Sequence, residues 1–432
     1  MSEWKDFQLT DLFEVQIGGT PSRGVKHYWA NENQVDAIPW VSIADMFSNN
    51  TIIKSKESIT IDGFNHSNVK LIPKGTLLFS FKLTIGRVAF SGIELTTNEA
   101  IAALIPKRTN VASELIYYIL PKLLDSIIYD TAVKGKTLNK KKIAAITFNL
   151  PNSLSEQRKI ARILSTVDAV IEKTEAAITK YKAIKQGMMR DLFTRGLDEN
   201  GRLRPRYEDA PHLYQHTELG WVPKEWEVKK LGTILLRYGG HLQTGPFGSQ
   251  LHAQEYLFEG VPVVMPQDIN DGLIGTEQIA RIDERRANDL ARHRMVSGDV
   301  VIARRGDLSR AAAITESEQG WVCGTGCFLL RLKQSSLKAG FAAYVYRQDF
   351  VQRQIAGTAV GSTMPSLNNS VMSELVFPFC DEGEQGRIVQ RLEKTEQYIR
   401  IHRKILATNQ KLKQGLMSDL LTGKKQVRVE KG

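Results

Sequence analysis

The chain has 432 residues, of which 42% are hydrophobic and 24% charged, so its composition is that of a folded globular protein and excludes a disordered or fibrous one. Its length exceeds one ordinary core and suffices for two or three domains. The net charge of +11 favours a polyanionic partner, and since no polybasic block adjoins an amphipathic anchor, nucleic acid is a better candidate than a membrane surface.

The N-terminal residues 1–13 show no basic segment followed by an apolar one, and no apolar run approaches the length that crosses a bilayer. We therefore expect a cytoplasmic protein. The odd number of cysteines, Cys323, Cys327 and Cys380, argues against a disulfide framework. We expect all three to be small buried hydrophobic residues, because the C-x3-C pair has no neighbouring histidines with which to hold zinc.

Residues 1–150 form the first predicted domain. Within residues 74–90, a glycine turn, a β-rich run, a basic loop and a second apolar run indicate a hairpin with a basic connection. This loop and the earlier loop at residues 18–23 offer small polar and cationic groups that can approach a phosphate closely. The domain closes with Gly135-Lys136-Thr137, which is not a P-loop, because Asp130 stands where the first glycine is needed. The candidate DNA contacts of this domain are Thr20, Arg23, Lys82, Thr84, Arg87, Lys136 and Thr137.

Residues 151–196 are predicted to form the first spacer helix. From residue 156 to residue 194 the chain lacks proline and is rich in Lys, Gln, Glu, Ala and Leu, which favours one helix spanning roughly 60 Å. Its apolar residues recur at steps of three and four, as the a and d positions of heptads do. This seam consists of Ile160, Leu164, Val167, Ile171, Ile178, Met188 and Leu192.

Residues 197–223 are polar and carry several prolines and glycines, which predicts a linker. The second predicted domain, residues 224–378, repeats the first more loosely. Trp226 opens a W-x4-L motif as Trp4 does, and residues 297–314 again indicate a hairpin with a basic loop.

Eight arginines and no lysine fall within thirty residues of the second domain: Arg281, Arg285, Arg286, Arg292, Arg294, Arg304, Arg305 and Arg310. Arginine suits bidentate contact to guanine edges and to phosphate. The alternative is a solvated charged face on which these arginines pair with neighbouring carboxylates, and it applies more readily to the first five than to the three in the hairpin loop. The candidate DNA contacts of this domain are Thr244, Arg304, Arg305, Arg310, Ser362 and Thr363.

Residues 379–424 are predicted to form the second spacer helix, followed by a tail at residues 425–432. The stretch KQGLMSDLLTG in this helix repeats KQGMMRDLFTRG of the first, and the two helices align at one offset of 228 residues. A long helix with a narrow apolar stripe needs a partner, and the other copy is the obvious one. The alternative is that each stripe packs separately on its own domain. The second seam consists of Ile388, Leu392, Ile399, Leu406, Leu416 and Leu420.

No catalytic motif stands out in the chain. There is no H-E-x-x-H, no G-x-S-x-G, no G-x-G-x-x-G after a strand and no Asn- or Asp-Pro-Pro-aromatic motif of the kind that amino-methyltransferases use. The eight histidines do not cluster. We therefore expect neither catalysis nor a metal site.

The order of domain, helix, domain and helix resembles the specificity subunits of Type I restriction-modification systems. The resemblance rests on Leu-Pro or Phe-Pro and then Glu-Gln opening each helix, and on Lys-Gln-Gly-hydrophobic-Met-x-Asp-Leu near its end. In the second domain, Gly-Asp before a hydrophobic run and Arg-Arg-Gly, and Gly-Ser-Thr before the helix, are similar to that family's target recognition domains. The first domain departs from the pattern, with Ser80-Phe81-Lys82 in place of the arginines and Gly135-Lys136-Thr137 in place of Gly-Ser-Thr.

The resemblance implies two tandem target recognition domains of mixed α/β (α+β) fold, separated by two long antiparallel coiled-coil helices with an internal pseudo-two-fold repeat. Each domain would read one half of an asymmetric bipartite site in double-stranded DNA. The helices would dock two methyltransferase subunits, which would recruit motor-nuclease restriction subunits. S-adenosylmethionine, ATP and Mg would be bound by those partners and none by this chain. The alternatives are a cytoplasmic helical scaffold without sequence-specific DNA binding and an enzyme with an unrecognised site.

Overall fold

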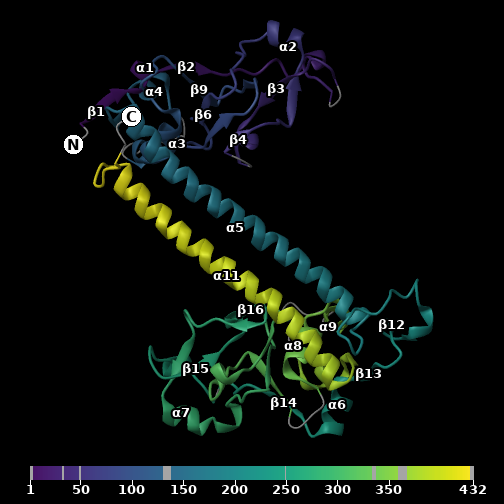
Figure 1. The fold of residues 1–432 in the computed structure, drawn as a ribbon. Helices are drawn as coiled ribbons and strands as arrows, with labels where there is room; N and C mark the ends of the chain where they lie inside the picture. The colour runs from purple at the N-terminus through teal and green to yellow at the C-terminus, as the bar shows by residue number, and fades with distance from the viewer. Residues whose placement is uncertain are drawn as a thin grey trace. The chain divides into compact units, whose positions relative to one another are not determined.

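The computed structural model of the chain describes residues 3–31, 34–47, 50–129, 138–248, 250–332, 337–358 and 367–428 (Figure 1). The chain forms two compact units, one made of Met1–Glu175 with Lys404–Gly432 and the other of Ala176–Arg403. Each of the two long helices therefore contributes one part to each unit.

The first unit holds a sheet in the order β2-β9-β6-β7-β4, in which only β4 and β7 run parallel. A second sheet, β5-β3-β8, and the pair β1-β10 complete the unit. The strands are β1 Trp4–Gln8, β2 Phe13–Ile17, β3 Ile38–Val41, β4 Thr51–Ile52, β5 Glu57–Ile59, β6 Leu77–Ser80, β7 Val88–Ser91, β8 Thr96–Thr97, β9 Ile101–Pro106 and β10 Thr147–Pro151.

The second unit repeats this plan. Its sheet β14-β22-β19-β20 corresponds to β2-β9-β6-β7, its sheet β18-β15-β21 to β5-β3-β8, and its pair β13-β23 to β1-β10. The repeat seen in the sequence is therefore also a repeat of topology. The strands are β11 Tyr214–Thr217, β12 Gly220–Pro223, β13 Glu227–Lys230, β14 His241–Thr244, β15 Val261–Val264, β16 Ile269–Asn270, β17 Leu273–Ile274, β18 Ala280–Ile282, β19 Val300–Ala303, β20 Ala311–Ala313, β21 Val322–Cys323, β22 Cys327–Arg331 and β23 Val376–Phe379.

The strands β6 and β19 are buried along their whole length because the side chains on both of their faces pack in hydrophobic cores, which explains their almost continuous apolar sequence. Each one starts an antiparallel hairpin, β6 with β7 and β19 with β20. The loops that join them span residues 81–87 and 304–310. Both hairpins with basic connections that the sequence predicted are thus confirmed.

Short helices flank the sheets, and equivalent ones begin in the same way. The side chain of Asn139 caps α4 by accepting a hydrogen bond from the Lys142 amide, and that of Asn368 caps α10 by accepting one from the Val371 amide. The helices are α1 Leu9–Leu12, α2 Ile61–Asn65, α3 Ser113–Tyr129, α4 Lys140–Ala144, α5 Leu154–Thr194, α6 Leu231–Tyr238, α7 Glu284–Asp289, α8 Ala339–Tyr346, α9 Asp349–Thr358, α10 Asn369–Glu374 and α11 Glu382–Leu420.

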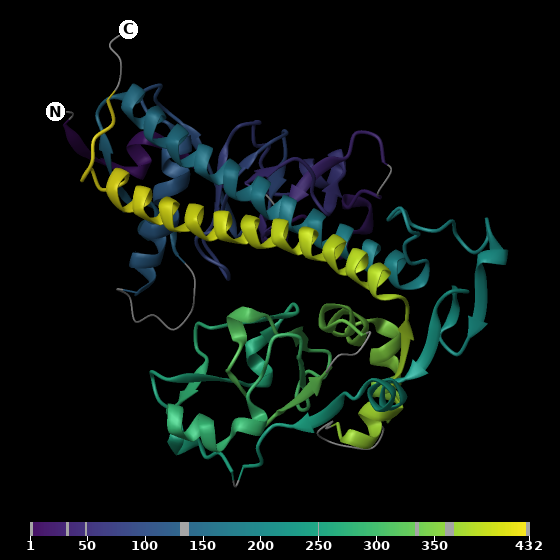
Figure 2. The same cartoon turned by 60° about the horizontal axis from the view of Figure 1, so that its bottom comes forward.

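In each unit, part of α5 lies beside part of α11, as both views of the ribbon show (Figures 1 and 2). In the second unit the contacts run antiparallel: Tyr181 stacks on Tyr398 and Lys185 pairs with Glu396, while the Thr395 hydroxyl approaches the Met188 sulfur. The first unit joins the start of α5 to the end of α11.

The seam residues near the helix ends also belong to the domain cores. Leu192, Ile388 and Leu392 lie in the main core of the second unit, and Ile160, Leu164 and Leu420 lie in that of the first. Both packing modes weighed from the sequence are therefore present. Of the other seam residues, Ile178 and Ile399 are buried, whereas Val167, Ile171, Met188, Leu406 and Leu416 are partly buried.

The segment at residues 197–223, predicted as a linker, is folded. It forms the antiparallel hairpin β11–β12, and Leu197 at its start is fully buried. Arg204 within it makes an ion pair with Glu384 of α11 at 2.6 Å. Gly201 and Gly220 adopt positive φ angles, and the segment belongs to the second unit.

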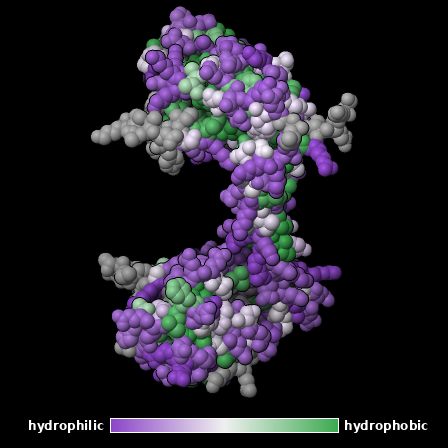
Figure 3. All heavy atoms as spheres, turned by 90° about the vertical axis from the view of Figure 1, so that its left-hand side faces the viewer, coloured by the Kyte–Doolittle hydropathy of each residue, from purple (hydrophilic) through white to green (hydrophobic). Residues whose placement is uncertain are grey.

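The three cysteines are free and buried, as predicted. No described helix combines the length and the apolar character needed to cross a membrane. The face drawn in Figure 3 is covered mainly by hydrophilic side chains, with apolar ones distributed among them.

Candidate nucleic-acid interface

The basic loop of the first domain is organised by Ser80, the last residue of β6. Its hydroxyl donates to the Thr84 carbonyl at 2.5 Å and accepts from the Arg87 amide at 3.0 Å. The main chain of Ser80 also pairs with that of Arg87. Leu83 at the tip has a positive φ of 61° and is 76% exposed. The loop is therefore a closed turn that exposes Leu83 and Arg87, while Phe81 is buried in the core.

Three of the predicted contacts in this domain gather around Glu99. The Thr20 hydroxyl donates to its carboxylate, and the positive charges of Lys82 and Arg23 lie close enough to act on it. The hydrogen bond from Thr20, helped by these two charges, lowers the pKa of Glu99 below its ordinary value. The structure thus brings the loop at residues 18–23 and the hairpin loop together.

Arg23 is held by an aromatic and an acidic partner. Its guanidinium lies 3.6 Å from the ring centroid of Trp29 and 4.9 Å from that of Trp40, and it bonds both carboxylate oxygens of Glu57, at 2.5 and 3.0 Å. The hydrogen bonds from Arg23 lower the pKa of Glu57. Arg87, the other arginine predicted here, lies 4.5 Å from the exposed ring of Phe47.

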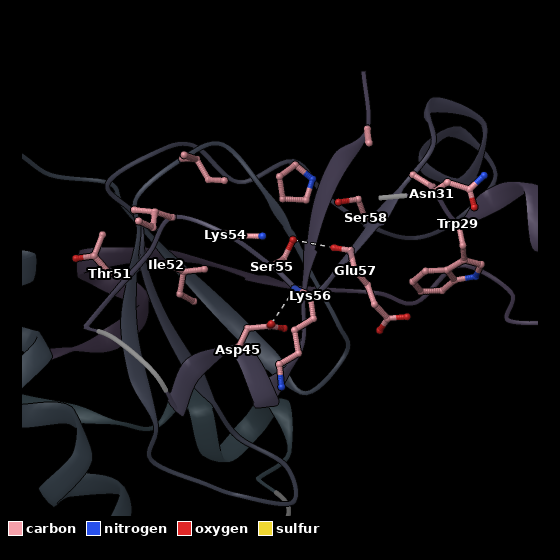
Figure 4. Close-up of a pocket in the computed structure, with 15 residues that line it drawn as sticks. Trp29, Asn31, Asp45, Thr51, Ile52, Lys54, Ser55, Lys56, Glu57 and Ser58 are labelled. Carbon is pink, nitrogen blue, oxygen red and sulfur yellow. Dashed lines mark hydrogen bonds between the residues drawn. The ribbon is translucent and has the colours of Figure 1, made fainter. Parts of the chain in front are cut away.

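Trp29 and Glu57 also line an open pocket of about 900 Å³ (Figure 4). Its wall between β4 and β5 carries Lys54 and Lys56, and the amide of Lys56 bonds the Asp45 carboxylate at 3.0 Å. Aromatic, cationic and acidic groups therefore alternate along this edge of the first domain.

The three arginines predicted in the loop of the second domain play different parts. Arg304 is partly buried and its Nε donates to the Leu367 carbonyl at 3.0 Å. Arg310 pairs with Asp307 and donates from Nη1 to the carbonyls of Pro266, Gln267 and Ile269 and to the Asn270 side chain, at 3.1–3.3 Å. Arg305 between them is exposed and makes no hydrogen bond or ion pair with any residue that the structure describes.

Thr244, at the end of β14, pairs with Phe328 of β22. The amide of its neighbour Gln243 contacts the Arg292 carbonyl at 3.0 Å and Nδ1 of His293 at 2.9 Å. Burial lowers the pKa of His293. The end of β14 is therefore fixed against the arginine-rich segment. It corresponds to the end of β2, after which residues 18–23 follow in the first domain.

Lys136, Thr137, Ser362 and Thr363 lie outside the residues that the structure describes. The first described residues after them are Leu138 and Leu367. The amide of Leu138 donates to the Phe81 carbonyl at 2.9 Å, and the amide of Leu367 to the Arg304 carbonyl at 3.1 Å. In both domains, the chain that follows these predicted contacts is thus bonded to the first residue of the basic loop.

A family model described as Type I restriction modification DNA specificity domain matches residues 1–180 and 223–410. The chain belongs to this family. The match covers both predicted domains and most of both long helices, so it confirms the family that the sequence motifs had indicated.

This specificity-family chain is similar to specificity subunits from several organisms, among them Methanocaldococcus jannaschii and Haemophilus influenzae. It is 31% identical over 243 residues to the specificity subunit of Type I restriction enzyme MjaIX from Methanocaldococcus jannaschii, a match that covers 54% of this chain and 52% of that protein. It is 24% identical over 454 residues to the specificity subunit of a putative Type I enzyme, MjaX, from the same organism, which covers 99% and 95%.

The fold agrees with that of a solved specificity subunit. The crystal structure of a Type I restriction-modification system S subunit from M. genitalium gives a TM-score of 0.63 at 17% identity, covering 97% of this chain and 96% of that one. The predicted fold class, two tandem mixed α/β domains with long helices, is thereby confirmed.

Most of the first five arginines of the second domain have structural partners. Arg286 pairs with Glu255 at 2.5 Å, Arg294 with Glu284 at 2.6 Å, and Arg281 donates to a backbone carbonyl. Arg285 and Arg292 are exposed. The charged-face interpretation, in which these arginines pair with carboxylates, therefore describes Arg286 and Arg294. No cluster of His, Cys, Asp and Glu within the described ranges is arranged to hold a metal ion.

One repeated contact between domain and helices was missed in the sequence. In the first unit the Tyr118 hydroxyl bonds Asp168 of α5 at 2.8 Å, and Asp168 pairs with Lys413 of α11 at 2.6 Å. Burial, followed by this hydrogen bond, raises the pKa of Tyr118 far above its usual value.

The second unit repeats the contact with Tyr344, Glu396 and Lys185. Lys185 pairs with Glu396 at 2.5 Å, and burial together with Glu396 raises the pKa of Tyr344. Glu396 stands 228 residues after Asp168, as Lys413 does after Lys185. The signal in the sequence is that the acidic and the basic residue of each contact recur at the offset of 228 residues.

Proposed function

We propose that this chain is the non-catalytic DNA-recognition subunit of a Type I restriction-modification complex. Each target recognition domain reads one half of an asymmetric bipartite site in double-stranded DNA. Family membership supports the general role. The observation that carries the finer proposal is the repeated hairpin, which presents a loop of different side chains in each domain.

The two loops differ in their chemistry, so the two half-sites differ as well. The first domain presents Lys82, Thr84 and Arg87, whereas the second presents Arg304, Arg305 and Arg310. Of these, Arg305 is the best candidate for a base contact, because its five donors are free of described partners and arginine pairs bidentately with guanine. Arg310 instead holds the turn at residues 266–270, so its role is to fix the loop.

In the first domain, cations held by intramolecular partners contact the DNA backbone. Arg23 is oriented by Glu57 and Trp29, while Thr20 and Lys82 surround Glu99. Side chains that are already ordered lose less conformational entropy when they bind a phosphate. Thr244, Lys136, Thr137, Ser362 and Thr363 complete the proposed contacts.

The partners are two adenine-specific methyltransferase subunits, docked on the long helices, and the motor-nuclease subunits that they recruit. S-adenosylmethionine, ATP and Mg belong to those subunits. The many exposed side chains along α5 and α11 support this assignment, because an exposed helix surface can dock a partner.

The test is to sequence adenine methylation in cells that express a cognate methyltransferase with and without this chain. We expect a chain-dependent motif of two unlike halves around a gap of fixed length. A complex that assembles but adds no motif would contradict the proposal and favour a scaffold, whereas DNA modification by the purified chain alone would indicate an enzyme.

A further inference from the structure

One short turn of the first domain, residues 98–101, is the point at which the predicted DNA-contacting segments meet. The Gly18 amide donates to the Ile101 carbonyl at 3.2 Å. A Cβ on Gly18 would lie 2.1 Å from the carbonyl oxygen of Thr97, so the approach requires a glycine. The loop at residues 18–23 therefore begins against this turn.

The basic hairpin loop begins against the same turn. The Phe81 amide donates to the Ala100 carbonyl at 3.0 Å, and the Phe81 carbonyl accepts from the Leu138 amide at 2.9 Å. Leu138 is the first described residue after the predicted contacts at residues 136–137. All three parts of the first domain that were predicted to contact DNA are thus linked to residues 98–101, either directly or through Phe81.

The turn is held by hydrogen bonds of its own and carries Glu99 at its tip. The Asn98 carbonyl accepts from the Ile101 amide at 3.2 Å, and the Asn98 side chain accepts from the Ala100 amide at 3.1 Å. The Asn98 amide in turn donates to the Val41 carbonyl of β3 at 2.9 Å. Glu99 itself is exposed. The turn therefore presents an exposed carboxylate on a fixed backbone, as precise recognition requires.

The carboxylate of Glu99 lies among groups that were predicted to contact DNA. The Thr20 hydroxyl donates to it, and the positive charges of Lys82 and Arg23 act on it. The hydrogen bond from Thr20, together with these charges, keeps the pKa of Glu99 below its ordinary value, so the group is ionised at neutral pH. Among the described residues, its other donor is its own amide. Because a carboxylate has roughly four acceptor positions, it can still accept from a group outside the chain.

The second domain repeats this arrangement with a different side chain at the tip of the turn. The equivalent hydrogen bonds run from the amides of Gly245, Arg304 and Leu367 to the carbonyls of Cys327, Gly326 and Arg304, at 2.8, 2.8 and 3.1 Å. Thr325, which is partly buried, takes the place of Glu99. The two domains thus share the backbone of the turn and differ in the side chain that it presents.

A carboxylate beside phosphate-binding cations has opposite effects on the two parts of DNA. It is repelled by every phosphate, so it lowers affinity for all sequences alike. The base edges in the major groove differ, because cytosine and adenine present an amino donor where guanine and thymine present an oxygen acceptor. An ionised carboxylate accepts from the first pair of bases and repels the second pair, so it discriminates between them.

We propose that Glu99 is a specificity-determining residue of the first domain, which accepts a hydrogen bond from the exocyclic amino group of a cytosine or an adenine. This inference rests on the proposed function and deepens it by naming the base chemistry that one residue reads. Thr20 orients the carboxylate, while Lys82 and Arg23 bind the neighbouring phosphates. Thr325 carries no charge, so the second domain lacks this preference.

Binding of the assembled complex to DNA duplexes tests the proposal. The half-site of the first domain is the one that stays unchanged when the second domain is exchanged, and each of its positions is varied through the four base pairs. At one position the wild type should favour cytosine or adenine in one strand by roughly 10- to 100-fold, the range expected for a hydrogen bond to a charged group. The favoured base shows which of the two is read.

Substitutions of Glu99 should change the preference at this position alone. Glu99→Ala should abolish it, because no acceptor remains. Glu99→Gln should still bind the amino base but should also admit guanine or thymine, because an amide both accepts and donates. A role of Glu99 through its charge alone would make these two variants alike.

Matched variants separate base reading from other effects. Glu94→Gln removes an exposed carboxylate that precedes β8 and should leave the preference unchanged. Glu57→Gln removes the carboxylate that holds Arg23, so it should change the affinity for all sequences by one factor. Thr325→Ala lies in the other domain and should leave this half-site unchanged.

Two results would overturn the proposal. If Glu99→Ala and Glu99→Gln change the affinity for every sequence by the same factor, the residue only adjusts charge or orders its neighbours. If neither variant alters a preference that the wild type shows, Glu99 contacts no base. A wild-type complex without any half-site preference would contradict the proposed function itself, so the two failures are distinguishable.

Discussion

Arginines of one loop can have opposite roles, and the contacts of Arg305 and Arg310 show how. Arg310 donates hydrogen bonds to the carbonyls of Pro266, Gln267 and Ile269. Arg305 is exposed and has no described partner, so its donors can bind a group outside the chain. Their sequence neighbourhoods are equally basic, so only their surroundings distinguish a DNA contact from a structural residue.

We expect Arg305→Ala to weaken recognition of one half-site by about 1–3 kcal/mol, the value of a bidentate base contact, and to leave the thermal stability unchanged. Arg310→Ala should instead lower the stability of the second domain by about 1–3 kcal/mol, because the hydrogen bonds of a charged group to three carbonyls and to the Asn270 side chain are lost. Methylation rates on substrates altered in one half-site, together with thermal unfolding, separate the two effects. The exposed Arg285 provides a control, and Arg285→Ala should change neither quantity.

The cysteines offer a second prediction at this scale. Burial raises the pKa of Cys323 to about 12 and that of Cys327 well above its ordinary value. Because the thiolate is the reactive species, native protein at pH 8 should not react with a thiol reagent such as Ellman's. All three thiols should react after denaturation. Rapid reaction of any thiol in the native protein would show that a core opens readily.

At the scale of elements, the Tyr-carboxylate-Lys contacts join each domain to both long helices. Asp168 and Glu396 each receive a tyrosine from the domain and a lysine from the opposite helix. A heptad seam alone permits sliding by one heptad, whereas a buried polar contact fixes the register. These contacts therefore set where each domain sits along its own helix segments.

We expect Asp168→Asn to destabilise the first unit by about 1–3 kcal/mol, since the side chains of Asp168 and Lys413 are only 16% and 31% exposed. Glu396→Gln should cost more, because it leaves Lys185 and Arg347, both about as buried as Glu396, without their carboxylate. Asp419→Asn is the matched control on α11: its partner Lys425 is 74% exposed, so the loss should stay below about 1 kcal/mol. Urea unfolding of the four proteins measures these differences, and equal losses in all variants would contradict the register role.

At the scale of the whole molecule, the repeated topology shows where the second domain can be replaced by a domain from another chain. β13 begins at Glu227 and β23 ends at Phe379, and these two residues pair directly. A domain exchanged between them keeps Trp226, Glu384 and both long helices in place. The two long helices, and with them the proposed docking surface, therefore remain those of this chain.

We expect a chimaera carrying another domain between Glu227 and Phe379 to change one half of the methylated motif and to keep the other half. The gap should keep its length, because the helices are unchanged. Methylation sequencing with the chimaera and with the parent chain measures this. A change in both halves would contradict independent reading by the two domains.

The sequence by itself determined the repeat, the two long helices, the paired hairpins and the burial of the cysteines. Those features follow from local rules: apolar periodicity, glycine turns and composition act within a few residues of each position. The family also followed, because its motifs lie at helix starts and ends.

Only the tertiary structure decided which partners the individual charged side chains have. Residues 197–223 look like a linker in sequence, but Arg204 finds a buried carboxylate 180 residues away. Arg305 and Arg310 differ in the contacts that other segments of the chain make with them. Because a charged side chain is governed by desolvation and by the partners that fold around it, its role depends on contacts that are distant in the chain.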